Sequence, residues 1–211
     1  MDETSLAATR RSLHAVAELL LAGPQYRDHG TIRLSVTPGG FATVTGTGLR
    51  VDGTDLVTDR QRLAIAGRSC ADLAAAAGVA PHALREAYPD ASTVTPGEIL
   101  DLDPAAAGWL ARCWSAGDTA LRRLDPAQRP VLWPEHFDVA VRIDGTNFGV
   151  SPGDGAIPQP YAYVGPPAPR PGPFWNQPFG AARPLRDLDD AHPDAVLAFF
   201  AEGRRRIAAG D

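Results

Sequence analysis

Apolar and polar residues follow two different spacings along the chain, and these spacings predict where helices and strands form. Apolar residues that recur every three or four positions are typical of one face of an amphipathic helix. Gly23-Pro24 is expected to end the first helical segment, whereas Asp103 caps a later one and Pro104 occupies its first turn. Helices are predicted at residues 4–22, 70–78, 104–124 and 193–209.

Short stretches between the helical segments alternate apolar with polar residues, which is typical of strands with one buried face. Turn residues such as Pro38-Gly39-Gly40 and Asp52-Gly53 separate these stretches and indicate hairpins. Strands are predicted at residues 31–36, 41–44, 49–51, 55–58, 62–66 and 137–143. The pattern therefore predicts a single α+β domain over residues 1–211, an antiparallel sheet of short strands with the long helices packed on one side.

Residues 151–180 differ from the rest of the chain, with nine prolines and five glycines in thirty positions. Prolines at this density do not fit a central strand. The segment also carries aromatic residues that a plain linker would lack, namely Tyr161, Tyr163, Phe174, Trp175 and Phe179. We therefore expect an ordered Pro-rich aromatic loop packed on the body of the protein, with a short strand at 161–164.

Composition and charge narrow the class of protein. Hydrophobic residues make up 44% of the chain and the net charge is −5. These values are ordinary for a globular protein and argue against nucleic acid as a partner, which needs a concentrated basic surface. All basic residues are Arg, so Schiff-base chemistry through a lysine is excluded. Cys70 and Cys113 lie far apart, and neither a signal peptide nor a membrane-spanning run is visible, so a cytoplasmic location is expected.

Motifs that would identify a cofactor are missing from the sequence. It contains no phosphate-binding loop, nucleophile elbow, metalloprotease helix or Cys/His zinc pattern. The Asp-, Asn- and Gly-rich stretch at 144–155 fails the spacing of a calcium loop and is interpreted as turns. The sequence therefore assigns no cofactor and no metal site, and it leaves the oligomeric state open.

The candidate chemistry lies in the stretch Trp133-Pro134-Glu135-His136-Phe137-Asp138. Residues two apart on a strand share a face, so His136, Asp138 and Arg142 are expected to lie together. In one interpretation Asp138 orients His136 as a general base, and in another both hold a metal ion. A solvated polar strand face is the alternative without a function.

The first functional hypothesis from these residues is a small-molecule-binding protein. Whether it is also an enzyme stays open. Its pocket would lie between the strand at 136–144 and the Pro-rich loop, since pockets combine apolar walls with a few polar groups. His136 and Asp138 are the catalytic candidates. The expected ligand-binding residues are Trp133, Glu135, Arg142, Tyr161, Tyr163 and Trp175.

Two alternative functions stay open. Residues 70–88 follow the residue pattern of a helix-turn-helix, with Ala74, Gly78 and Leu84 at its small, turn and buried positions, which would make the protein a DNA-binding regulator. Arg85 and His82 are the basic residues of its second half, which is little for phosphate contact. The other alternative is a protein-interaction domain that uses the aromatic loop.

Several short motifs, taken in chain order, resemble a family of bacterial proteins of unknown function. The motifs are Ser12-Leu13-His14, Ile32–Phe41 with its Thr37-Pro38-Gly39-Gly40 turn, Ser69–Leu73, Trp133 with Phe137–Ala140, Pro160–Tyr163 and Pro193–Phe199. The Pro-Glu-His before Phe137 departs from that family. The resemblance implies one α+β domain and carries neither an activity nor functional residues.

Overall fold

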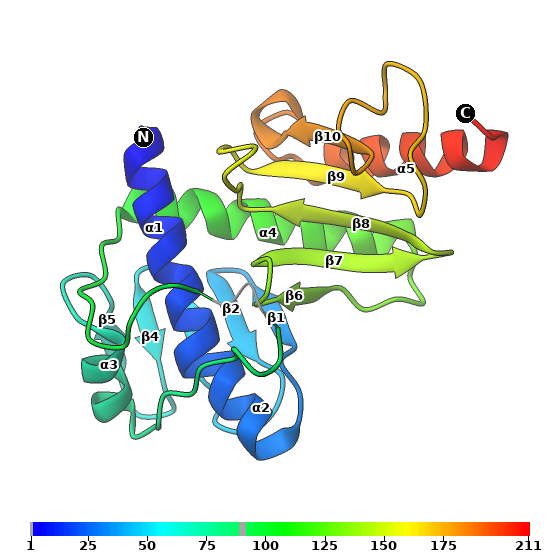
Figure 1. The fold of residues 1–211 in the computed structure, drawn as a ribbon. Helices are drawn as coiled ribbons and strands as arrows, with labels where there is room; N and C mark the ends of the chain where they lie inside the picture. The colour runs from blue at the N-terminus through cyan, green and yellow to red at the C-terminus, as the bar shows by residue number, and fades with distance from the viewer. Residues whose placement is uncertain (1, 89–91) are drawn as a thin grey trace. The chain divides into compact units, whose positions relative to one another are not determined.

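The protein has an α+β fold built from antiparallel strands and helices (Figure 1). The computed structural model describes residues 2–88 and 92–211. Two compact units form within the chain. The first unit comprises the residues up to Arg112 together with Leu132–Phe137, and the second comprises Cys113–Val131 and Asp138–Asp211.

The first unit begins with a long helical segment that is longer than the sequence predicts. Helix α1 (Glu3–Val16) runs through a π-helix, η1 (Ala17–Ala22), into helix α2 (Gly23–His29). The expected stop at Gly23-Pro24 is therefore wrong. Pro24 lies in the first turn of α2, where its missing N–H is tolerated, and the segment ends instead at Gly30 with φ 70°.

A row of buried side chains crosses the antiparallel strands of the first unit. Phe41 pairs with Val51, Val51 with Leu56 and Leu56 with Leu63, and all four are buried. The strand order is β6-β1-β2-β3-β4-β5. The strands are β1 (Leu34–Thr37), β2 (Gly40–Thr43), β3 (Arg50–Asp52), β4 (Asp55–Val57), β5 (Arg62–Ala64) and β6 (Val131–Trp133). Helix α3 (Cys70–Ala77) follows β5 and begins with a capping box between Ser69 and Asp72.

The second unit is an antiparallel sheet with helices on one face, in the order β10-β9-β8-β7. Its elements are β7 (Asp138–Ile143), β8 (Thr146–Ser151), β9 (Tyr161–Gly165), β10 (Ala181–Pro184), the short 3₁₀ helix η2 (Leu185–Asp187) and helix α5 (Pro193–Ala209). Helix α4 (Pro104–Leu124) starts in the first unit and ends in this one. The arrangement agrees with the predicted antiparallel sheet and long helices.

Two glycines show how closely the helices of the second unit approach its strands. A Cβ added at Gly117 of α4 would lie 2.8 Å from Val139 and Val150, and one at Gly203 of α5 would lie 2.8 Å from Val164. The strand register places these three valines on the same face. Both helices therefore pack on one face of β7–β10 (Figure 1). Asp138, Tyr161 and Tyr163 lie on the opposite face.

The Pro-rich segment is ordered and packs on the second unit, as predicted. The ring of Phe174 lies 5.4 Å from that of Phe199 on α5 and 4.8 Å from that of Trp175. The predicted short strand is β9. Among residues 2–88 and 92–211, no helix has the length and apolar character needed to cross a membrane.

Candidate functional site

His136 lies in a turn and not on a strand. The turn covers residues 134–137, and β7 begins only at Asp138. Phe137 has φ 53°, a left-handed conformation in which the alternation of a strand does not hold. Its ring stacks on His14 at 5.0 Å and contacts Phe41 edge-on at 5.4 Å. Strand geometry therefore does not place His136, which is exposed, on the face of Asp138.

Asp138 belongs to a network of carboxylates and tyrosines in the second unit. It is 5% exposed and accepts a hydrogen bond from the Tyr163 hydroxyl. The Tyr161 hydroxyl donates to Asp154 Oδ2 at 2.6 Å, and the two tyrosine rings lie 6.2 Å apart. Burial and the neighbouring carboxylates raise the pKa of both tyrosines, so their hydroxyls stay protonated and donate.

The other expected ligand-binding residues fall in separate places. Trp133 and Glu135 are half-buried in the first unit, and the Arg33 guanidinium lies 5.7 Å from the Trp133 ring. Arg142 is exposed on β7. Trp175 is buried beside Phe174, and its indole N–H has no hydrogen-bond partner among the described residues. The structure thus links Asp138, Tyr161 and Tyr163, while the other predicted site residues lie outside this network.

A buried carboxylate that the sequence interpretation missed lies in the first unit. Glu18 sits on the π-helix η1 and is 2% exposed. The Tyr88 hydroxyl donates to its Oε1 at 2.6 Å, and the Ser92 backbone N–H donates to its Oε2 at 2.5 Å. Burial raises the pKa of Glu18, opposed by these two hydrogen bonds and by the charge of Arg85. The sequence signal was a single Glu within the apolar run Val16–Ala22.

Pro24 explains why the segment with Tyr88 packs on this helix. In the π-helical turn, the Gly23 N–H donates to the Glu18 carbonyl five residues earlier. The next carbonyl, that of Leu19, would need the N–H of Pro24, which does not exist. The His82 N–H donates to the Leu19 carbonyl instead, at 3.1 Å. The proline thus creates the acceptor that holds the loop.

Glu18 lies in the wall of a cleft of about 310 Å³. Most of the wall is apolar, and Arg85, Ser92 and Thr95 supply polar groups beside the carboxylate. This volume is at the lower end of the range for small-molecule sites, about 300–1,000 Å³. The cleft is lined by Glu18, Leu19, Pro81, Ala83, Leu84, Arg85, Ser92, Val94, Thr95 and Pro96.

His14 lies one helical turn before Glu18 and is uncharged at neutral pH. Its Nε2–H donates to the Pro134 carbonyl at 2.6 Å, and Nε2 lies 3.9 Å from Glu18 Oε1. Burial lowers the pKa of His14 to about 4, opposed by the hydrogen bond to Pro134 and helped by the charge of Arg10. His14 therefore supplies no counter-charge to Glu18 at neutral pH.

Residues 78–88 do not form the second helix of a helix-turn-helix. The chain leaves α3 at Gly78, with φ 71°, and continues as loop and turn to Tyr88. Leu84 and Tyr88 are buried. The DNA-binding alternative therefore lacks its recognition element within the described residues. Residues 89–91 lie outside them.

The aromatic loop does not form a flat exposed patch. Tyr161 and Trp175 are buried, Tyr163 and Phe174 are half-buried, and Phe179 is 43% exposed. Among residues 2–88 and 92–211, no three His, Cys, Asp or Glu side chains are grouped as metal ligands.

Comparison with known proteins adds no relative to this picture. No protein-family model, no curated protein and no solved structure matches the chain. The geometry of Glu18 and its cleft is therefore the basis on which a function can be argued, and the resemblance to a bacterial family stays a prediction.

Proposed function

We propose that this chain is a cytoplasmic small-molecule-binding protein whose ligand binds in the cleft beside Glu18. The observation that carries the proposal is a carboxylate that is 2% exposed, has a raised pKa and lines a cleft of about 310 Å³. A titratable group with a perturbed pKa in a cleft is a candidate for a functional site. A cytoplasmic location accords with two buried thiols in a chain without disulfides among its described residues.

The chemistry of the cleft favours a ligand with an apolar body and a protonated amine. A carboxylate can accept about four hydrogen bonds, and Tyr88 and Ser92 supply one each. Burial makes the negative charge of Glu18 costly, and His14 is neutral above pH 4. An ammonium group would add to the counter-charge that Arg85 supplies from the cleft wall, while Leu19, Leu84 and Val94 contact the apolar part.

The backbone around Glu18 supports the same proposal. π-Helical turns are rare and occur frequently at functional sites. Here the Leu19 carbonyl of the turn accepts a hydrogen bond from the His82 N–H of the loop. The same loop contributes Leu84 and Arg85 to the cleft wall. The irregular helix and the cleft are therefore parts of one arrangement.

A ligand screen tests the proposal directly. Ligand-observed NMR with matched aryl-alkyl amines, alcohols and carboxylic acids should detect binding of the amines to the wild-type protein. Glu18→Gln should weaken this binding about ten-fold or more, since a charged hydrogen bond becomes neutral. Glu86→Gln, an exposed carboxylate outside the cleft wall, is the matched control and should bind as the wild type does. Preference for the carboxylic acids, or equal binding to Glu18→Gln, would contradict the proposal.

An enzymatic activity that uses Asp138 stays a second candidate. What supports it is the burial of Asp138 and its hydrogen bond from Tyr163. Native mass spectrometry of protein purified from its own host would identify a ligand that stays bound, whether it binds in the Glu18 cleft or at the second candidate site. Loss of that ligand in Glu18→Gln supports the cleft, whereas loss in Asp138→Asn with retention in Glu18→Gln supports the second candidate.

A further inference from the structure

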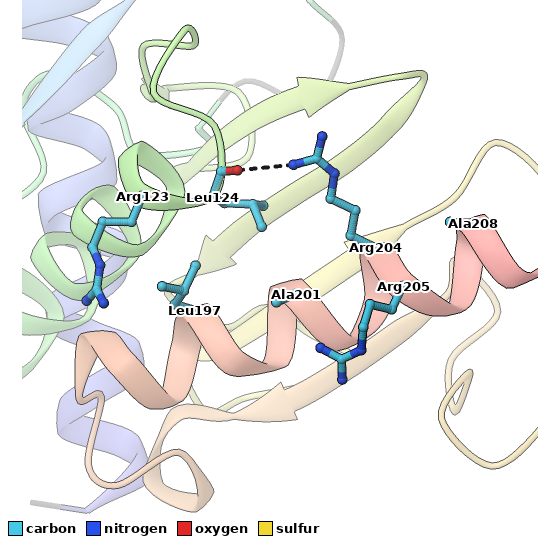
Figure 2. A pocket seen from close by; sticks show the side chains of 7 residues that line it. All are labelled: Arg123, Leu124, Leu197, Ala201, Arg204, Arg205 and Ala208. Carbon is cyan, nitrogen blue, oxygen red and sulfur yellow. Dashed lines mark hydrogen bonds between the residues drawn. The ribbon is translucent and has the colours of Figure 1, made fainter.

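An open groove in the second unit carries three arginines on an apolar floor. Figure 2 shows Arg123 and Leu124 at the end of α4 facing a row of residues along α5. The groove has a volume of about 460 Å³, and no acidic side chain lines it. The residues from α5 are Leu197, Ala201, Arg204, Arg205 and Ala208.

The exposed face of α5 has the spacing of a coiled-coil seam. Asp194, Leu197, Ala201, Arg204 and Ala208 are separated by three, four, three and four residues, which is the spacing of the a and d positions of a heptad. They are exposed or half-exposed, whereas Val196, Phe199 and Phe200 face the strands and are buried. Two of the five residues are charged, so packing of this row against another helix would depend on charge pairing as well as on the apolar contacts of Leu197, Ala201 and Ala208.

Charge is distributed unevenly along this seam. Asp194 lies in the first turn of α5, after the exposed acidic residues Asp187, Asp189 and Asp190. The other end carries Arg204, Arg205 and Arg206, of which Arg205 and Arg206 form ion pairs with Glu202, whereas Arg204 donates to the Leu124 carbonyl. The acidic beginning and the basic end are therefore complementary to each other when two such helices run in opposite directions.

We propose that the occupant of this groove is a second copy of the chain, with the two α5 helices packed antiparallel about a two-fold axis. In one register Asp194 lies opposite Arg204 of the other copy, and Leu197 lies opposite Ala201. The two-fold axis repeats both pairs, as an isologous interface requires. Asp194 then forms an ion pair with Arg204 of the other copy, the large Leu197 packs against the small Ala201, and the helix dipoles are antiparallel.

The intramolecular contacts of these charged groups are compatible with the pairing. Arg123 holds Asp194 at 2.5 Å, and Arg204 donates to the Leu124 carbonyl at 3.1 Å. A guanidinium has five N–H donors and a carboxylate accepts several hydrogen bonds, so each group can serve a second partner. An unrelated anion would use the arginines but would give Asp194 and Leu197 no role, which favours the self-paired occupant.

Charge reversal in the full-length chain tests the proposal. The wild-type protein should dimerise with concentration in analytical ultracentrifugation, weakly because one helix pair buries little surface. Arg204→Glu and Asp194→Arg should each raise the dissociation constant about a hundred-fold, since each sets like charges opposite each other twice. An equimolar mixture of the two variants should form a heterodimer, because every facing pair is then again of opposite sign. That restoration also shows that both variants are folded.

Three results would overturn the proposal. The first is a wild-type chain that stays monomeric up to millimolar concentration. The second is a dimer that neither reversal weakens, which would place the interface elsewhere. The third is a mixture that fails to associate although circular dichroism shows both variants folded, which would mean that Arg204 meets an acidic group other than Asp194.

Discussion

At the scale of single residues, His14 and Glu18 illustrate how burial acts on a base and an acid one helical turn apart. Burial disfavours the charged form of each, so it lowers the pKa of His14 to about 4 and raises that of Glu18 above its usual value of 4.5. Stability should therefore depend on pH through both residues, with opposite signs.

His14 should weaken the fold in acid. In the unfolded chain His14 binds a proton below about pH 6.5, whereas in the folded protein it does so only near pH 4. Above pH 6.5, His14 therefore contributes up to about 3 kcal/mol to the free energy of unfolding. This contribution is lost as the pH falls towards 4. His14→Phe keeps a ring against Phe137. In urea unfolding, the free energy of unfolding of this variant should fall less between pH 7 and pH 4 than that of the wild type. The same slope in variant and wild type would show that another group titrates.

Glu18 should act in the other direction. Glu18 stabilises the fold below its pKa in the unfolded chain, about 4.5. This contribution to the free energy of unfolding is lost as the pH rises through the raised pKa of Glu18 in the folded protein. Glu18→Gln removes the titration but leaves one of the donors Tyr88 and Ser92 without an acceptor, a cost of about 1–3 kcal/mol. The unfolding free energy of the variant should therefore rise relative to the wild type as the pH rises above 4.5. A difference independent of pH would refute the raised pKa.

Individual site residues were harder to predict than the fold, and the reasons are physical. Strand alternation relates side chains only where the backbone is extended, and Phe137 interrupts it with φ 53°. Glu18 lies 70 positions from its partner Tyr88, so no local pattern indicates their hydrogen bond. The link between Asp138 and Tyr163 likewise depends on the pairing of β7, β8 and β9.

At the scale of elements, Gly23 marks where the helix and the loop of the cleft meet through their backbones. A Cβ added there would lie 1.8 Å from the His82 carbonyl oxygen and 2.8 Å from that of Glu18. Gly23→Ala should therefore displace the loop and lower the free energy of unfolding by about 2 kcal/mol or more. Chemical denaturation measures this change.

Gly108 provides the control for that substitution. It lies within α4, and an added Cβ would meet nothing closer than Arg112 Nη1 at 3.8 Å. Gly108→Ala should therefore stabilise the protein by about 0.5–1 kcal/mol through helix propensity. If both substitutions stabilised the fold, the close approach of the loop to Gly23 would be wrong.

The elements that the sequence predicted best are those whose ends depend on neighbouring residues. Helices α4 and α5 have the predicted bounds because Asp103 caps one, with its carboxylate accepting from the Ala106 N–H at 2.8 Å, and Pro193 opens the other. The end of the first helix was missed because a proline normally stops a helix. Here the π-helical turn and the distant His82 N–H satisfy the backbone that Pro24 leaves unpaired.

At the scale of the whole molecule, two buried thiols can report whether the chain unfolds as the single domain that its sequence predicts. Cys70 belongs to the first unit and Cys113 to the second, and both are fully buried. Burial also raises the pKa of Cys70 to about 12, so its thiolate is scarce in the folded protein. Neither thiol should react with iodoacetamide until the structure around it opens.

Helix α4 gives the reason to expect one transition. It contributes residues 104–112 to the first unit and residues 113–124 to the second, so loss of either unit removes packing from the same helix. Peptide mass spectrometry after pulsed alkylation should therefore show Cys70 and Cys113 becoming reactive at the same urea concentration, with fully unfolded protein as the reference for their intrinsic rates. Separate midpoints would mean that the two units fold as independent domains and that α4 frays between them.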